Sequence, residues 1–344
     1  MKVAIFFALL GLYNAVKAQK NLTEFNINSL DSLKVIKVTS FYNHIDFIDS
    51  RDDKQLGFLD KKRIDTLKAI IPIETQIKTL FHNCVDETSL KDGKILFQLK
   101  RLNFSEFIDR ELVTKAYCSL GATVYKVRGD KFQKIAFIDT LIVKDYEFLK
   151  SSFTKKALKG CYQSISNLIS KAVQLCPDSS EYFSLGEVKN IDSIEKSKTQ
   201  LYSTVKFKDG IYLFFESFKN QIPEHVIEKV KFKKDKLTSV EEFIEGAGGI
   251  EINREYTYAV VYQGKPYICT KFGFYPLEKR GIDFFFKGNI ADINGGVSQY
   301  LIGTILLGRF GGDLLADIAT SKASVEIKID YAKGTFIITK VFED

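Results

Sequence analysis

The chain of 344 residues has no tryptophan, three histidines and five prolines, and its single methionine is the first residue. Histidine is the commonest metal ligand and general base, and His44, His82 and His225 stand far apart in the sequence. The chain also lacks the HExxH, GxSxG and GxxxxGKS/T spacings of zinc proteases, serine hydrolases and phosphate-binding loops. These absences argue against the commonest metal-, serine- and nucleotide-dependent enzymes, and we expect neither a metal nor a cofactor.

Cysteine is also scarce, and the five cysteines are Cys84, Cys118, Cys161, Cys176 and Cys269. Their number is odd and no two form a CxxC, so the sequence predicts neither a zinc site nor a thioredoxin-type pair. Cys84, Cys161 and Cys176 fall on the apolar sides of predicted helices, where buried free thiols are common. One disulfide remains an alternative in an oxidising compartment.

The chain has no concentrated charge of one sign, although its net charge is +7. The basic groups at 61–63, 155–156 and 231–234 are separate and mixed with acids, as on solvated surfaces. A leader holding Lys2 and Lys17 would leave 7 − 2 = +5 on the rest of the chain. We therefore expect no nucleic-acid partner. A hydrophobic content of 45% indicates an ordinary globular protein.

Residues 1–18 predict a cleaved secretory signal peptide. Lys2 gives a positive start, and residues 3–13 form an apolar run too short to span a bilayer. Val16 and Ala18 supply the residues that signal peptidase reads, so Gln19 is the expected new N-terminus. We expect a periplasmic or extracellular protein without a lipid anchor, because no cysteine follows the cleavage site. We expect no transmembrane helix in the mature chain.

Residues 19–176 predict an α+β domain. Apolar residues recur at helical spacing over 72–85 and 146–176, and Pro177 ends the second helix. Extended segments are expected within 34–60 and over 94–102, 116–127 and 131–143, the last two joined by the hairpin turn Arg128-Gly129-Asp130. We expect a mostly antiparallel sheet with two helices on one face. The hairpin explains the Arg-Gly-Asp tripeptide, which otherwise matches an integrin-binding motif.

Residues 177–200 are polar and weakly periodic, and we interpret them as a linker before a β-rich domain over 201–344. Several of its predicted strands are separated by glycine-containing turns. The predicted strands are 202–207, 211–214, 225–232, 254–262, 266–272, 282–287, 324–331 and 335–341.

The glycine-rich, apolar segment 293–319 interrupts this pattern. Arg309 and Asp313 exclude a simple transmembrane helix, because each charge costs about 2.5–3.5 kcal/mol at the bilayer centre. The segment is either a helical excursion packed on the sheet or an exposed apolar patch that contacts a partner or a membrane surface. The candidate interaction surface consists of Leu301, Ile305, Leu306, Leu307, Leu314 and Leu315.

Two charged clusters are candidate sites. The run from Asp49 to Asp53 fails as an EF-hand, because Lys54 and Asp60 occupy its sixth and twelfth positions instead of glycine and glutamate. A turn closed by Asp–Arg pairing is the better interpretation. Glu106 and the residues 109–111 form the second cluster, and the sequence does not show whether any acid pair converges there.

Residues 210–223 (GIYLFFESFKNQIP) resemble a pattern in uncharacterised secreted proteins of Bacteroidota. Residues 264–268 (GKPYI) are similar to a recurring strand of that group, and residues 17–20 to the ends of its leaders. The tryptophan that precedes this strand in the group is absent here, where Tyr262 lies nearby. The resemblance covers 201–344 and implies no known activity.

We interpret the first motif as a folding motif built on Gly210, Tyr212, Phe214, Phe218 and Pro223. Gly210 permits a tight turn, and the aromatic residues are expected to lock a strand to the short helix behind it. The N-terminal domain resembles small auxiliary lipoprotein domains of Gram-negative envelopes through residues 45–51 and its late long helix.

The function we expect is that of a non-enzymatic cell-envelope protein that acts by protein or glycan contact, with peripheral membrane contact as a further option. One alternative is a secreted hydrolase with an unlocated carboxylate pair, and another is an accessory subunit of envelope transport. Converging carboxylates, or His44 beside Asp49, would favour the enzyme. An exposed apolar surface around 301–315 would favour binding.

Overall fold

A computed structural model describes residues 23–27, 36–51, 54–59, 65–108, 114–145, 153–177, 181–289 and 324–342. Helices and sheets are mixed, which confirms the predicted α+β class. The described chain divides into two compact units, one up to Ser184 and one from Leu185 onward. The predicted leader and the whole apolar segment 293–319, including all six candidate residues from Leu301 to Leu315, lie outside the described residues.

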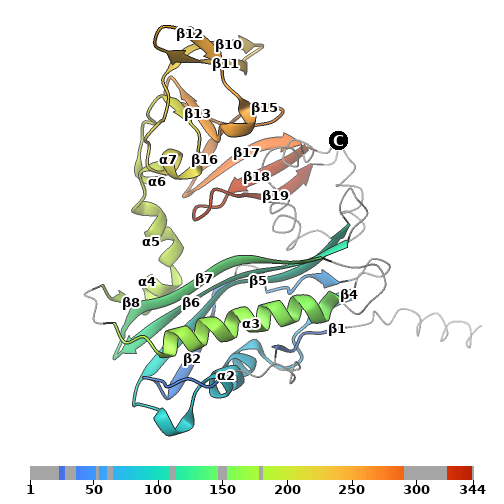
Figure 1. Ribbon diagram of the computed structural model, residues 1–344, viewed down its shortest axis with the longest axis vertical. Coiled ribbons are helices and arrows are strands. Elements are labelled where there is room, and N and C mark those ends of the chain that lie inside the picture. The colour runs from blue at the N-terminus through green and yellow to red at the C-terminus, as the bar shows by residue number, and fades with distance from the viewer. Residues whose placement is uncertain are drawn as a thin grey trace, which may run out of the picture. The chain divides into compact units, whose positions relative to one another are not determined.

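The first unit is built on a sheet with the strand order β2-β5-β6-β7-β8 (Figure 1). The predicted antiparallel arrangement holds from β5 to β8, whereas β2 pairs with β5 in parallel. A parallel pair needs a crossover connection, and the chain between β2 and β5 includes a helix. The strands are β2 (His44–Asp49), β5 (Lys94–Ile108), β6 (Thr114–Arg128), β7 (Lys131–Asp145) and β8 (Phe183–Ser184).

Two helices, α2 (Ile73–Cys84) and α3 (Phe153–Val173), cover one face of this sheet (Figure 1). Both were predicted from their apolar stripes, and those stripes are buried in one core with alternate residues of β5 and β6. Within the described residues no helix is long and apolar enough to cross a membrane. A small sheet of the order β1-β4-β3 completes the unit, formed by β1 (Thr23–Glu24), β3 (Phe58–Leu59) and β4 (Asp65–Lys68). A 3-10 turn (Glu87–Ser89) follows α2.

The described residues of the second unit form three sheets, in keeping with its predicted β-rich character. The first has the order β15-β14-β13-β9, the second β10-β11-β12 and the third β16-β17-β18-β19. Their strands are β9 (Gly210–Tyr212), β10 (Ile227–Lys233), β11 (Lys236–Ile244), β12 (Gly248–Glu251), β13 (Ala259–Tyr262), β14 (Lys265–Thr270), β15 (Gly273–Pro276), β16 (Glu278–Arg280), β17 (Asp283–Asn289), β18 (Ser324–Ile329) and β19 (Phe336–Phe342).

The segment 177–200 is more structured than its polar sequence indicates. It includes α4 (Leu185–Lys189), α5 (Ile191–Ser197) and the start of α6 (Gln200–Ser203), which are too short to give a clear helical period. The predicted strand over 202–207 is wrong, because Tyr202 lies in α6 and packs its ring against Phe284 at 5.1 Å. A fourth short helix, α7 (Phe215–Lys219), follows β9, and a 3-10 turn (Arg254–Tyr256) precedes β13.

Candidate functional site

The motif around Gly210 brings two separate segments of the second unit together. Gly210 has φ +147°, and a Cβ built on it would lie 2.4 Å from the Cβ of Pro223. The N–H of Ile211 donates to the carbonyl of His225 at 2.9 Å, so the chain after Pro223 runs beside β9. Only glycine fits this contact and this backbone conformation, and Gly210 begins β9 at this point.

Tyr212 and Phe218 connect β9 to α7 as predicted. Both side chains are fully buried, and their rings meet edge to face with centroids 5.2 Å apart. The Tyr212 hydroxyl donates to the carbonyl of Lys208 at 2.6 Å, which satisfies its polar atom inside the core. Burial raises the pKa of Tyr212, and the nearby carboxylate of Asp209 raises it further.

The role predicted for Phe214 is wrong, because 65% of this residue is exposed. Phe214 precedes α7 with an extended backbone, and Phe215 instead points inward. The Phe215 ring packs at 5.4 Å from that of Tyr258. The sequence pattern could not separate two adjacent phenylalanines, since the turn between β9 and α7 decides which one faces the core.

Phe214 is one of four exposed large apolar residues on neighbouring segments, with Ile222, Val226 and Phe243, and we call these four the apolar edge. Ile222 and Val226 are 63% and 68% exposed, and Phe243 on β11 is 50% exposed. Ile222 and Val226 lie on either side of the bend at Glu224. The N–H of Phe243 donates to the carbonyl of Val226 at 3.0 Å, which places these two residues side by side.

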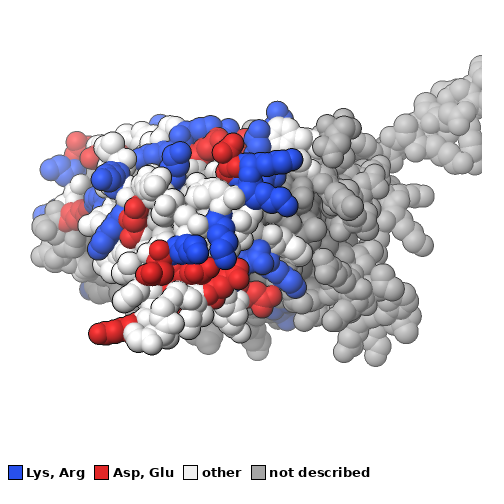
Figure 2. Space-filling model, turned by 90° about the horizontal axis from the view of Figure 1, so that it is seen from above, with Lys and Arg blue, Asp and Glu red and all other residues white. Residues whose placement is uncertain are grey.

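Carboxylates accompany the apolar edge. Glu224 lies between Ile222 and Val226 in the sequence, is exposed, and accepts a hydrogen bond from the N–H of Leu213 at 2.9 Å. Glu216 is exposed next to Phe214 and pairs with Lys219 at 3.5 Å. Single exposed apolar residues are common, but adjacent ones of this size indicate a binding surface. Acidic and basic side chains are interspersed on the face that Figure 2 shows.

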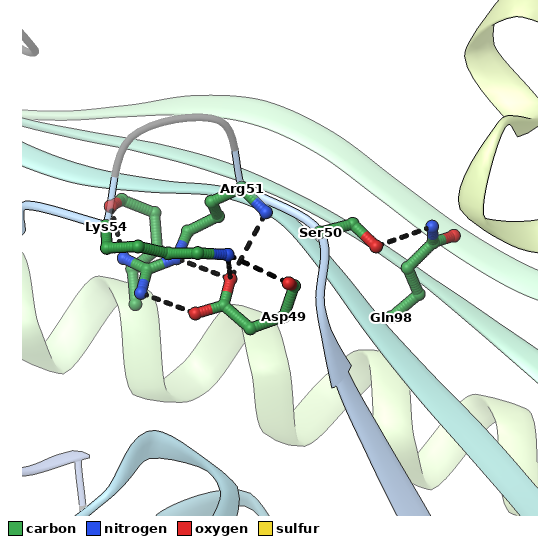
Figure 3. Close-up of polar contacts among 6 residues, drawn as sticks. Asp49, Ser50, Arg51, Lys54 and Gln98 are labelled. Atoms are coloured by element: carbon green, nitrogen blue, oxygen red, sulfur yellow. Dashed lines mark hydrogen bonds and ion pairs between the residues drawn. The ribbon is translucent and has the colours of Figure 1, made fainter.

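The predicted pairing within the cluster at Asp49 is confirmed (Figure 3). Arg51 donates from Nη2 to Asp49 Oδ2 at 2.8 Å and from Nε to Oδ1 at 2.9 Å, while Lys54 Nζ lies 3.1 Å from Oδ1. Burial acts to raise the pKa of Asp49, but the hydrogen bonds from Arg51 outweigh it and hold the pKa below its usual range. Ser50 points away and accepts a hydrogen bond from Gln98 at 3.0 Å. Asp49 and Arg51 thus form an ion pair at the end of β2, whereas Asp52 and Asp53 lie outside the described residues.

The histidine arrangement that would favour an enzyme does not form. His44 begins β2 and contacts Asp46 at 3.1 Å, whereas Asp49 ends the same strand. Adjacent strand residues rise about 3.3 Å each, so His44 and Asp49 stand roughly 16 Å apart along the strand. His82 is exposed on α2, and His225 in the second unit pairs with Glu242 at 3.1 Å.

The structure brings together two carboxylates that sequence reasoning missed. Asp192 and Glu195 on α5 both lie 2.9 Å from the hydroxyl of Tyr331. Their spacing of three residues on a helix was the available signal. Beside them Lys196 pairs with Asp283 at 2.7 Å, and Lys328 pairs with the same carboxylate at 2.8 Å.

The structure describes only some of the remaining candidate residues. Residues 109–111 and the side chain of Glu106 lie outside what the structure describes. In the described ranges no three histidine, cysteine, aspartate or glutamate residues cluster as metal ligands would. The predicted hairpin turn at Gly129 is confirmed, with φ +62° and an exposed Arg128 and Asp130.

Comparison with known proteins adds little to this geometry. No family model matches the chain. No curated protein matches it either. One solved structure with some likeness is a protein of Xanthomonas campestris assigned to family DUF330, at 10% sequence identity and a TM-score of 0.28. The alignment covers 51% of this chain and 95% of the Xanthomonas protein.

Proposed function

We propose that this chain is an exported, non-enzymatic protein of the cell envelope that binds a protein partner through the apolar edge. The observation that carries the proposal is the exposure of Phe214, Ile222, Val226 and Phe243 on adjacent segments. Covering an exposed aliphatic or aromatic side chain of this size yields about 1.5–3 kcal/mol, so a surface of this kind stabilises a complex.

The chemistry of the edge indicates the kind of partner. Phenylalanine, isoleucine and valine offer no hydrogen bonds, so they favour an apolar protein surface over the hydroxyl groups of a glycan. The carboxylates of Glu216 and Glu224 would meet lysine or arginine at the margin of the partner's surface. Export rests on the leader at residues 1–18, and the resemblance to secreted proteins of Bacteroidota supports the same compartment.

The test is a crosslinked pull-down from cell envelopes with matched variants. Phe214→Ser and Phe243→Ser should each weaken recovery of the partner roughly 10–100-fold, since each removes about 1.5–3 kcal/mol of burial. Phe137→Ser is the control, because Phe137 is also 65% exposed but belongs to the first unit. Equal loss in all three variants, or no loss in the first two, contradicts the apolar edge. Binding to protein-free envelope glycan would assign the contact to sugar instead.

A secreted hydrolase is the second candidate, because Asp192 and Glu195 converge. Paired carboxylates of glycosidases stand about 5–10 Å apart with substrate between them. Here the hydroxyl of Tyr331 fills that position, at 2.9 Å from each. Hydrolysis of chromogenic glycosides by the purified chain, abolished in Glu195→Gln, would support the enzyme. The accessory-subunit alternative predicts co-purification with a membrane transport complex.

A further inference from the structure

The first unit brings two of the five cysteines together. Cys118 lies on β6 and Cys161 on α3, and both are fully buried in the same core between the helices and the sheet. Burial raises the pKa of the Cys118 thiol, and the neighbouring Cys161 side chain raises it further. Sequence spacing alone could not select this pair, because the two residues meet only when α3 packs on the sheet.

A glycine explains the close approach of helix and sheet. A Cβ built on Gly160 would lie 2.8 Å from Cγ2 of Ile142, so any larger residue would push α3 away from β7. Ile142 is the cross-strand partner of Cys118. Cys161 follows Gly160 directly, so it lies in the turn of α3 that packs against Ile142, the residue paired with Cys118.

The other cysteines have different surroundings. The Cys84 thiol lies 3.9 Å from the carbonyl of Ser166, and the Cys269 thiol in the second unit lies 3.7 Å from the carbonyl of Arg254. Cys176 is exposed, with its sulfur 3.4 Å from Nζ of Lys126. Among the described cysteines, Cys118 and Cys161 are therefore the two that lie as neighbours in one core.

We propose that Cys118 and Cys161 form a disulfide when the chain folds in an oxidising compartment, an inference that rests on the predicted export. One cysteine thiolate attacks a low-molecular-weight or protein disulfide and releases one thiol of that oxidant. The second thiolate then attacks the mixed disulfide and releases the other thiol. Two cysteine thiols are oxidised, and one disulfide of the oxidant is reduced to two thiols.

The bridge must form before the core closes. Both thiols are inaccessible in the folded unit, and burial raises the pKa of the Cys118 thiol well above its usual range. An oxidant therefore reaches them only while α3 is away from the sheet, during folding or local opening. Once formed, the bridge closes the loop from 118 to 161 and limits the freedom of the unfolded chain.

The experiment refolds the purified chain in oxidised and reduced glutathione, traps free thiols with iodoacetamide in denaturant and measures the intact mass. The reduced chain, with its five cysteines, takes five labels, and the bridged chain should take 5 − 2 = three. Peptide mapping should find Cys118 joined to Cys161. We expect dithiothreitol to lower the melting temperature of the bridged protein by roughly 5–10 °C.

Matched variants control the assignment. Cys118→Ser and Cys161→Ser should each take all four of their labels, whereas Cys176→Ser should still lose two. Peptide mapping of the wild-type chain keeps the test valid if a core variant fails to fold. Five labels on the refolded wild type, or a bridge between other cysteines, would overturn the pair. A bridge formed in glutathione but absent from protein recovered from cells would instead contradict export.

Discussion

Gly210 and Pro223 lie so close that a Cβ on the glycine would stand 2.4 Å from the Cβ of the proline. Twelve residues lie between them in the sequence, and these include α7. This contact fixes the segment that follows Pro223 beside β9, and therefore fixes the position of Ile222 and Val226 on the apolar edge. The edge thus depends on a glycine that is itself fully enclosed.

Gly210→Ala should destabilise the second unit strongly. The added methyl group would clash with Pro223, and the backbone would be held at φ +147°, which alanine rarely adopts. We expect a loss of about 3 kcal/mol in the free energy of unfolding, measured by urea denaturation. Gly246→Ala is the matched control, since Gly246 also has positive φ (+80°) but nothing within 4 Å of its Cβ position. Equal losses in both variants would show that the close contact with Pro223 is unimportant.

Arg51→Met should remove stability that depends on pH. The Arg51 side chain is only 5% exposed and makes two hydrogen bonds to Asp49, so we expect a loss of about 2 kcal/mol at pH 7. The pKa of Asp49 is lowered in the folded state, so the stability it supplies exists above its unfolded value near 3.8 and disappears as pH falls through the folded value.

The measurement for Arg51 is urea denaturation between pH 3 and pH 7. The difference between wild type and Arg51→Met should shrink as the pH falls below about 4. Lys54→Met serves as the control, because Lys54 contacts the same carboxylate but is 57% exposed and should contribute below about 1 kcal/mol. A difference between wild type and Arg51→Met that is constant with pH would indicate lost packing without the ion pair.

Buried tyrosines should make the fold sensitive to alkali. Burial raises the pKa of several phenols in both units, and two carboxylates raise that of Tyr331 further. A raised folded pKa gives stability that is complete below the unfolded value of about 10 and is lost as pH rises toward the folded value. The tyrosines concerned are Tyr42, Tyr202, Tyr212, Tyr258, Tyr267 and Tyr331.

Absorbance at alkaline pH checks this expectation. Near pH 11 the folded chain should show less phenolate than the same chain in urea, and the free energy of unfolding should fall above pH 10. Identical titration curves in the folded and unfolded chains would contradict the burial of these phenols.

Local periodicity was sufficient to predict α2, α3 and the hairpin of β6 and β7. It failed where tertiary contacts decide the outcome. Residues 236–244 form β11 although their apolar residues do not alternate regularly, because a shift in register near Phe232 and Leu237 breaks the period. The choice between Phe214 and Phe215 depends on the turn before α7. The meeting of Cys118 and Cys161 depends on Gly160, which no pattern in the sequence marks.

Replacing different members of the ion-pair cluster formed by Asp283, Lys196 and Lys328 should cost different amounts of stability. Lys196 is 8% exposed and its ion pair is with Asp283, whereas Asp283 also pairs with Lys328. Asp283→Asn would leave the Lys196 ammonium buried without this carboxylate, and we expect it to cost about 3 kcal/mol. Lys196→Met would leave Asp283 paired with Lys328 and keep the apolar stem of the side chain, so it should cost about 1 kcal/mol.

Urea denaturation of the two variants and of the double variant gives the coupling, and the double variant should be more stable than Asp283→Asn alone. If Asp283→Asn is no less stable than Lys196→Met, the Lys196 ammonium is solvated in the folded protein. Only an ammonium kept from water depends so strongly on one carboxylate.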